Sequence, residues 1–228
     1  MGRDPKSIHK QLLISIGVTV FVLVAAMVGL LANRVAEQTV PSILPGLDSI
    51  SFTLQSSDGP VSNDDLLGRP VAVFFGFTHC PEVCPTTLYT LTSLIDEIGA
   101  DGSEAGDTQV GDNEAGDTQA ANTQVVFITV DPERDTPAIL ADYIRSMSDQ
   151  AIGLSGSRAA IDEAIKGFGV YAVKVPLDGD DGDYTMDHTA TVFLYDQTGA
   201  LSGTIAWGEP TDFAREKLKR LILSLIHI

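Results

Sequence analysis

Apolar residues are grouped into one long run near the N-terminus and several shorter runs after it. The long run, residues 12–32, carries no charged side chain and only two hydroxyl side chains, those of Ser15 and Thr19. At ~1.5 Å per helical residue it would extend about 31 Å, which is enough to cross the hydrocarbon core of a bilayer. We expect one transmembrane helix there, because a cleaved signal peptide would have a shorter apolar region and a small-residue cleavage site.

The shorter runs predict the strands and helices of an α/β domain. Residues 71–77 are continuously apolar, which is typical of a strand buried on both faces. Leu and Ile recur at helical spacing over residues 86–98, and Thr136 followed by Pro137 marks a helix start. Further predicted strands are residues 51–55, 125–130, 171–175, 190–195 and 201–207, and further helices are residues 158–168 and the segment from 210 onward.

This order of elements predicts an α/β sandwich with a mixed central sheet. The strands at residues 190–195 and 201–207 should form a hairpin, because a Thr-Gly turn separates them. Residues 100–123 interrupt the pattern with a repeat, since the six residues 104–109 recur at 114–119. Gly, Asp, Glu, Gln and Ala dominate this stretch, which cannot bury enough apolar surface to offset its ordering entropy. We interpret it as a flexible acidic insertion.

The charge distribution orients the chain. Lys and Arg number 14 against 31 Asp and Glu, which gives a net charge of −17 and argues against nucleic-acid binding. Three of the basic residues, Arg3, Lys6 and Lys10, precede the long apolar run. Because basic residues stay on the cytoplasmic side, we expect a cytoplasmic N-terminus and a soluble domain on the extracytoplasmic (periplasmic) side.

These observations predict the organisation of the chain. A cytoplasmic basic N-terminus (1–11) and the anchor (12–32) would be followed by a proline-containing linker (33–49) and a folded domain (50–222). The last six residues, 223–228, can be encoded by a string that resembles the transposon end used in sequencing libraries. We interpret these six residues as a sequence-assembly scar.

Candidate chemistry concentrates at the two cysteines of the chain, Cys80 and Cys84. They lie between the strand at 71–77 and the next helix, and Pro85 fits the first position of that helix. A helix N-terminus favours anions, so both thiols should ionise more readily than a free cysteine. Two such thiols can form a disulfide or share a soft metal ion. A static disulfide is the structural alternative, although so short a loop would constrain little of the unfolded chain.

Histidines are the next candidate ligands. The chain has four, His9, His79, His188 and His227. His79 adjoins Cys80, and in an extended segment its ring should point to the other side. His188 lies just before the strand at 190–195, which can sit near the strand that leads to the cysteines. Spacing alone leaves both a metal-binding and a surface role open for His188.

Three motifs, in order, resemble those of the SCO (SCO1/SenC) family. They are Phe-Gly-Phe-Thr-His-Cys-Pro-Glu-Val-Cys-Pro at residues 75–85, Val-Asp-Pro-Glu-Arg-Asp-Thr-Pro at 130–137 and Asp-His-Thr at 187–189. The resemblance covers roughly residues 45–222 apart from the acidic insertion. It implies a thioredoxin-like sandwich with a mixed central sheet and an added β-hairpin on a membrane tether. It further implies copper bound by Cys80, Cys84 and His188, and a role in building the binuclear copper centre of cytochrome c oxidase.

The residue chemistry agrees with this implication, because two thiolates and an imidazole suit Cu(I) and can also hold Cu(II). The resulting hypothesis is that the protein is a copper chaperone. Its expected partners are the copper-centre subunit of cytochrome c oxidase and a copper donor protein or thiol-disulfide reductant. Asp131 and Arg134 are expected to pin the loop that contains them, and Asp187 is a candidate to orient His188.

A thiol-disulfide oxidoreductase is the alternative hypothesis, with Cys80 and Cys84 as the redox pair that reduces the target cysteines of the copper site. Three residues separate these cysteines, whereas thioredoxins have two, which weakens the case for a general reductase. A peroxidase is a third hypothesis and would place one low-pKa cysteine in a pocket with Thr and Arg. The sequence leaves open whether the protein is an enzyme.

Overall fold

The computed structural model describes residues 26–27, 44–104, 120, 122–177 and 182–223. The predicted N-terminal segment (1–11) and scar residues 224–228 lie outside this part, and so does the anchor (12–32) apart from residues 26–27. No helix within the described ranges is both long and apolar enough to cross a membrane. The described residues from Leu44 onward belong to one structural unit.

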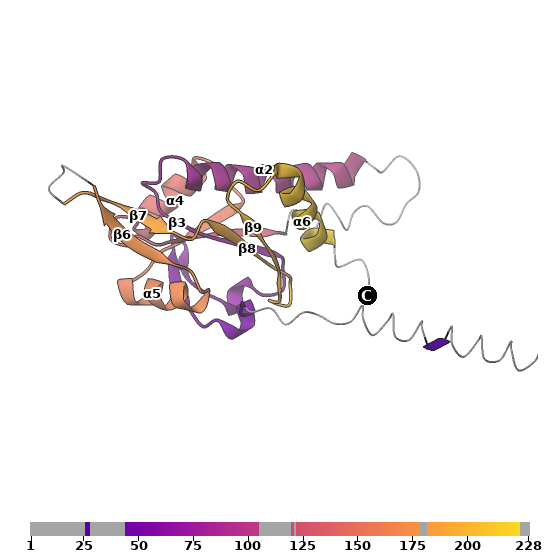
Figure 1. The fold of residues 1–228 in the computed structure, drawn as a ribbon, viewed down its shortest axis with the longest axis horizontal. Helices are drawn as coiled ribbons and strands as arrows, with labels where there is room; N and C mark the ends of the chain where they lie inside the picture. Colours follow the sequence, from indigo (N-terminus) through magenta and orange to yellow (C-terminus); the bar gives the residue numbers. More distant parts are fainter. Residues whose placement is uncertain (1–25, 28–43, 105–119, 121, 178–181, 224–228) are drawn as a thin grey trace, which may run out of the picture. The chain divides into compact units, whose positions relative to one another are not determined.

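A five-stranded mixed sheet forms the centre of this unit, with the strand order β5-β4-β3-β8-β9 (Figure 1). β3 is parallel to β4 and antiparallel to β8, while β5 extends the parallel part and β9 pairs antiparallel with β8. All six residues of β3 are buried, as its continuous apolar run predicts. The mixed sheet and the hairpin at residues 190–207 are therefore confirmed. The strands are β3 (Val71–Gly76), β4 (Gln124–Thr129), β5 (Ala151–Leu154), β8 (Thr191–Tyr195) and β9 (Leu201–Ala206).

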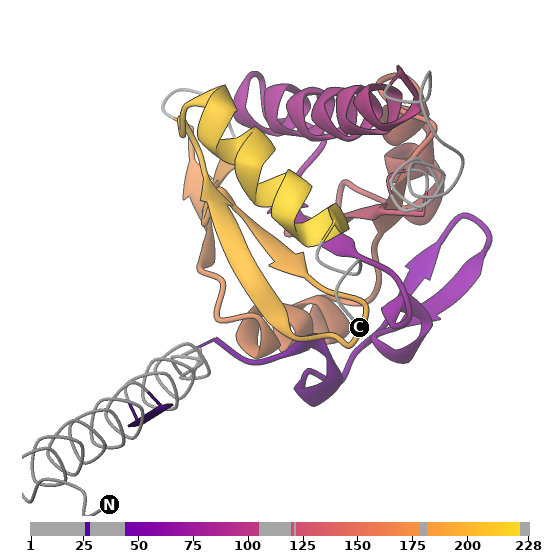
Figure 2. The same cartoon turned by 90° about the vertical axis from the view of Figure 1, so that its right-hand side faces the viewer.

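Helices cover both faces of the sheet. In Figures 1 and 2, α2 and α6 lie next to each other on one face, and α5 lies on the opposite face. Side-chain caps start two of the helices, since Thr136 accepts from the Ile139 amide and Ser157 from the Ala160 amide. The helices are α2 (Val83–Glu104), α4 (Pro137–Arg145), α5 (Arg158–Gly167) and α6 (Thr211–Leu223).

Two small antiparallel sheets flank the central one. β1 (Thr53–Ser56) pairs with β2 (Gly59–Ser62), and β6 (Ala172–Pro176) pairs with β7 (Tyr184–His188). The apolar pattern did not predict β2, β5 or β7. β7 has the sequence Tyr-Thr-Met-Asp-His, which is too polar to be recognised as a strand. His188, expected to precede the next strand, is the last residue of β7.

The domain begins earlier than the sequence predicts. The 3-10 helix η1 (Leu47–Ser49) lies within the expected linker 33–49, and Leu47 is fully buried, with its amide donating to the Gly199 carbonyl at 2.7 Å. A second 3-10 helix, η2 (Asp64–Leu66), precedes β3. Both ends of the insertion predicted at 100–123 also belong to the domain, since α2 continues to Glu104 and Ala120 is buried. Residues 105–119 and 121 of the insertion lie outside the described residues.

Replacing Gly76 by alanine should lower the free energy of unfolding by about 1–3 kcal/mol, the usual cost of overpacking a core. A Cβ at this end of β3 would lie 2.7 Å from Phe127 Cζ and 2.8 Å from Cys84 Sγ. Gly203→Ala is the matched control, because a Cβ at this β9 position meets nothing within 4 Å. Urea unfolding of the reduced protein measures both variants. Equal unfolding midpoints for the two would contradict the packing argument.

Candidate metal centre

The two cysteines lie where β3 ends and α2 begins. Cys80 is in the connecting loop, where its amide donates to the Phe77 carbonyl at 3.2 Å, and Cys84 is the second residue of α2. Both are free thiols, but Cys84 is fully buried whereas Cys80 is partly exposed. The missing side chain of Gly76 creates the space for the Cys84 sulfur, which packs against the backbone of β3.

The two thiols differ in protonation. A hydrogen bond from the Cys84 thiol lowers the pKa of Cys80 to about 5, against the opposing effect of burial, and backbone N–H groups at the start of α2 add to the lowering. One of these is the Cys84 amide, 3.4 Å from Cys80 Sγ. The same hydrogen bond, together with burial, raises the pKa of Cys84 far above its ordinary value. At neutral pH, Cys80 is therefore a thiolate and Cys84 a thiol that donates to it.

His188 reaches the buried cysteine from the end of β7. Its Nε2 lies 3.8 Å from Cys84 Sγ, and its Nδ1 lies 3.1 Å from the Thr189 carbonyl oxygen. A carbonyl only accepts, so Nδ1 carries the hydrogen of that bond and Nε2 of the neutral ring turns its lone pair toward Cys84. The rings of Phe74 and Phe77 contact the imidazole edge-to-face, with centroids 6.3 and 5.8 Å away.

Cys84 thus contacts both of the other predicted ligands, Cys80 and His188. In the part of the chain that the structure describes, no three His, Cys, Asp or Glu side chains are gathered as closely as a metal ion requires. His79 is exposed and directs Nδ1 to the Thr78 hydroxyl at 3.1 Å. Asp187 is exposed as well, and the His188 Nδ1 contact is with the Thr189 carbonyl instead.

A buried carboxylate that the sequence analysis did not single out supports the cysteine loop. Asp135 is fully buried and accepts from the amide and hydroxyl of Thr78, at 3.0 and 2.5 Å. It also accepts from the Thr129 hydroxyl at 2.6 Å. Because Thr78 is two residues before Cys80, these bonds fix the loop that carries the reactive thiol.

α4 contributes a second residue that the sequence analysis missed. The Tyr143 hydroxyl is buried and has no hydrogen-bond partner among the described residues. Its ring packs against Phe127, whose ring also limits the space beside Cys84. Burial, followed by the electrostatic interaction with the cysteine pair, raises the pKa of Tyr143 above its ordinary value. A neutral phenol therefore lies near the dithiol.

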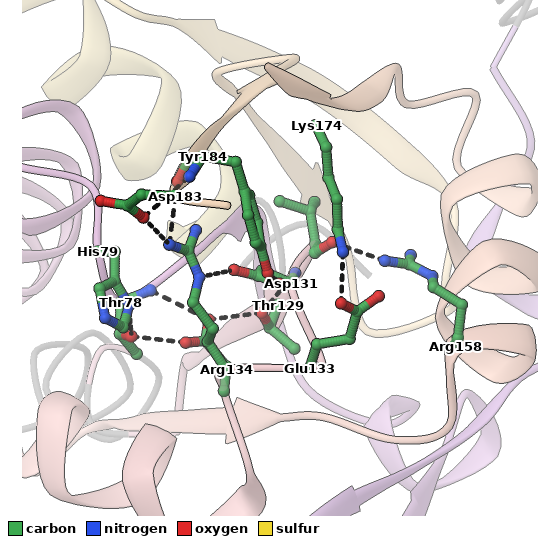
Figure 3. A network of polar contacts seen from close by, with 12 residues as sticks. Thr78, His79, Thr129, Asp131, Glu133, Arg134, Arg158, Lys174, Asp183 and Tyr184 are labelled. Carbon is green, nitrogen blue, oxygen red and sulfur yellow. Dashed lines mark hydrogen bonds and ion pairs between the residues drawn. The ribbon is translucent and has the colours of Figure 1, made fainter. Parts of the chain in front are cut away.

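The loop after β4 has the internal ion pair that the sequence suggests. Arg134 Nε donates to the carboxylate of the fully buried Asp131, and the Asp135 amide donates to the Asp131 carbonyl at 2.9 Å. Figure 3 shows that this pair also faces Tyr184 of β7, a contact that the sequence did not predict.

The reactivity of Cys80 should depend on pH with a midpoint near 5, since the thiolate fraction rises as pH rises through the pKa. The measurement is the anaerobic alkylation rate of the reduced protein against pH. Cys84→Ala should move the midpoint upward toward the ordinary value of about 8.5, because the strongest hydrogen bond to the thiolate is lost. Cys80→Ala should lower the pKa of Cys84, because the hydrogen bond to the Cys80 thiolate is lost, but burial should still make this thiol react at higher pH than an ordinary cysteine. A wild-type midpoint at 8 or above would refute the assignment.

Comparison with known proteins identifies a family whose sequence model covers nearly the whole described domain. A sequence model of the SCO1/SenC family matches residues 46–223. The human mitochondrial SCO1 homolog is 34% identical over 149 residues, which are 65% of this chain and 44% of the human protein. The SCO2-like protein RP587 of Rickettsia prowazekii is 32% identical over 149 residues, 65% of this chain and 64% of that protein. The matched segment thus spans less than two thirds of either relative.

Solved structures agree with the sequence match. Copper-bound ScoI of Bradyrhizobium japonicum is 38% identical and superposes with a TM-score of 0.60, covering 75% of this chain and 97% of that one. Copper-bound yeast Sco1 is 26% identical with a TM-score of 0.62, covering 82% of this chain and 92% of the yeast chain. The thioredoxin-like α/β fold with a mixed central sheet is therefore confirmed, and the chain belongs to the SCO1/SenC family.

Proposed function

We propose that this protein is a membrane-anchored copper chaperone. It binds one copper ion through Cys80, Cys84 and His188 and delivers it to the copper centre of cytochrome c oxidase. The observation that carries the proposal is the approach of His188 Nε2 to Cys84 Sγ, 3.8 Å apart, beside the Cys80 sulfur. The copper-bound relatives from Bradyrhizobium japonicum and yeast add support.

The donor set fits copper. Two sulfurs and an imidazole are soft to intermediate ligands, which suit Cu(I) and also serve Cu(II). Cys80 is already a thiolate at neutral pH and needs to lose no proton to bind, and the contact of His188 Nδ1 with the Thr189 carbonyl leaves Nε2 directed toward Cys84. Cys84 does need to lose one, because metal ligation requires the thiolate. Copper uptake near neutral pH should therefore release about one proton per ion.

The unequal burial of the ligands suits transfer rather than storage. Cys80 is partly exposed and can contact a donor or an acceptor first, while Cys84 is fully buried behind it. An ion held by three ligands at such an edge can pass to a partner by stepwise ligand exchange. The anchor at residues 12–32 would keep the domain on the extracytoplasmic (periplasmic) side. There it would meet the copper-centre subunit of the oxidase and a copper donor protein.

Replacing His188 should weaken copper binding more than replacing the neighbouring histidine. We expect His188→Ala to lower Cu(I) affinity by at least about tenfold, as the loss of a ligand should cost no less than the loss of its supporting contacts. His79→Ala is the control, because this exposed ring lies beside Cys80 and points to Thr78. The measurement is anaerobic Cu(I) titration of the reduced protein against a competing chelator. Equal affinities for the two variants would overturn the proposed ligand set.

A thiol-disulfide oxidoreductase is the second candidate, favoured by the unequal pKa values of the cysteines. The Cys80 thiolate would attack a partner disulfide and expel one partner thiolate. Cys84 would then attack the mixed disulfide, transfer its proton to the second leaving sulfur and form the Cys80–Cys84 disulfide. The partner disulfide is reduced to one thiol and one thiolate, the thiolate takes a proton from the solvent, and this protein is oxidised. Such a step could reduce the target cysteines before copper is delivered.

For this second function, Cys84→Ser should trap a mixed disulfide through Cys80, since the resolving thiol is gone. Cys80→Ser should trap none, because Cys84 is buried and protonated. His188→Ala should leave the exchange rate within about twofold. The measurement is mass spectrometry after mixing the reduced protein with an oxidised peptide that contains two cysteines. Absence of any adduct with Cys84→Ser would end the oxidoreductase hypothesis.

A further inference from the structure

The hairpin that carries His188 is only loosely joined to the central sheet by backbone bonds. β6 and β7 pair with each other in a separate two-stranded sheet, and four of the five residues of β6 are exposed. At the end near His188, the Thr189 amide donates to the Tyr171 carbonyl and the Tyr171 amide to the Thr189 hydroxyl, both at 3.0 Å. These bonds lie within the hairpin and do not fix its position on the domain.

Side chains of β7 provide the connection to the domain. Tyr184, Met186 and His188 are every second residue of β7 and so share one face of the strand, which is the face that buries Met186. Met186 is buried in the middle of this face. Tyr184 lies at the far end, ~13 Å from His188 at ~3.3 Å per residue. A contact that fixes Tyr184 therefore sets the direction of the strand that leads to His188.

Tyr184 is held on several sides at once. Its hydroxyl donates to Asp131 Oδ1 at 2.8 Å, and its carbonyl accepts from Arg134 Nη1 at 3.0 Å. Arg134 Cζ lies 3.8 Å and Lys174 Nζ 4.4 Å from the centre of its ring. Figure 3 shows the two cations on opposite sides of the ring. We call Tyr184 with Asp131, Arg134 and Lys174 the tyrosine clamp.

The loop that forms the clamp also holds the cysteine side of the centre. Thr129 accepts from the Asp131 amide at 2.9 Å and donates to Asp135 Oδ2 at 2.6 Å. Asp135 in turn accepts from Thr78, two residues before Cys80. One continuous hydrogen-bonded chain thus runs from the cysteine loop through the loop after β4 to the hairpin that carries His188.

We propose that Tyr184, held by Asp131, Arg134 and Lys174, is a positioning residue that keeps His188 against Cys84. The proposal rests on the proposed function for its copper readout, but the placement of His188 is a property of the metal-free protein. Tyr184 does not touch the cysteines, so it acts through the hairpin. The loop after β4 then works as a common frame for ligands that lie more than a hundred residues apart in the sequence.

Two variants of the full-length protein test this role. Tyr184→Leu removes the hydroxyl and the aromatic ring, while Tyr184→Phe keeps the ring between the two cations and loses only the bond to Asp131. Tyr171→Leu is the matched control, because this tyrosine precedes β6 and is 54% exposed. The first readout is the ¹⁵N spectrum of the His188 ring in reduced, metal-free protein, assigned with His188→Ala. We expect the His188 ring signals to shift most in Tyr184→Leu and less in Tyr184→Phe. In Tyr171→Leu they should stay at their wild-type positions.

The second readout is a double-mutant cycle on Cu(I) affinity. Tyr184→Leu should weaken binding about tenfold in the wild-type background, and by less than about twofold in the His188→Ala background. An equal loss in both backgrounds, or an unchanged His188 spectrum, would overturn the positioning role. If Tyr184→Leu does not fold, the same comparison with Tyr184→Phe decides the question. If the wild-type protein does not bind Cu(I), the proposed function fails while the metal-free spectrum still decides the role of Tyr184.

Discussion

The buried carboxylate of Asp135 sets the geometry on which the metal centre depends. Burying a carboxylate is costly unless strong donors surround it. Here the donors are the Thr78 amide and hydroxyl and the Thr129 hydroxyl, and the Ser155 hydroxyl donates to the Asp135 backbone carbonyl. These donors come from the loop after β3, from β4 and from the residue after β5. The hydrogen bonds to the carboxylate and the carbonyl of this one residue therefore register three parts of the fold, and the cysteine loop takes its place as a consequence.

The difference between the two cysteines follows from the same architecture. Gly76 at the end of β3 leaves room for a sulfur, and the first turn of α2 places Cys84 in that space. Cys80 stays in the loop. Backbone amides at the start of α2, which have no partner within the helix, donate to its sulfur. Donation to Cys80, together with burial, stabilises the neutral thiol of Cys84, and accepting hydrogen bonds stabilises the thiolate of Cys80. Two chemically identical side chains thus acquire different acidity from their positions alone.

The sequence predicts those elements that depend on residues close together in the chain. The buried strands β3 and β4, the cap at Thr136 and the β8–β9 hairpin all have recognisable apolar runs or turn residues. The cysteine pair followed from its place before a helix, but His188 needed the family resemblance, because the polar strand β7 gives no periodic pattern. Tyr184 and Asp131 are 53 residues apart in the sequence, and no local pattern can predict such a contact. Asp135 was missed for the same reason, since its role depends on a threonine 57 residues away.

The three proposed ligands differ in what holds them, and this difference separates the two candidate functions. The Cys84 sulfur is fixed by β3 and α2, and the loop of Cys80 is fixed by Asp135, so dithiol chemistry needs nothing from the β6–β7 hairpin. The imidazole is on that hairpin and depends on side-chain contacts with one loop. A change that loosens the hairpin should therefore remove the nitrogen ligand and leave the redox pair intact. Under the proposed function, copper affinity can then be adjusted through the hairpin without altering the reactivity of the thiols.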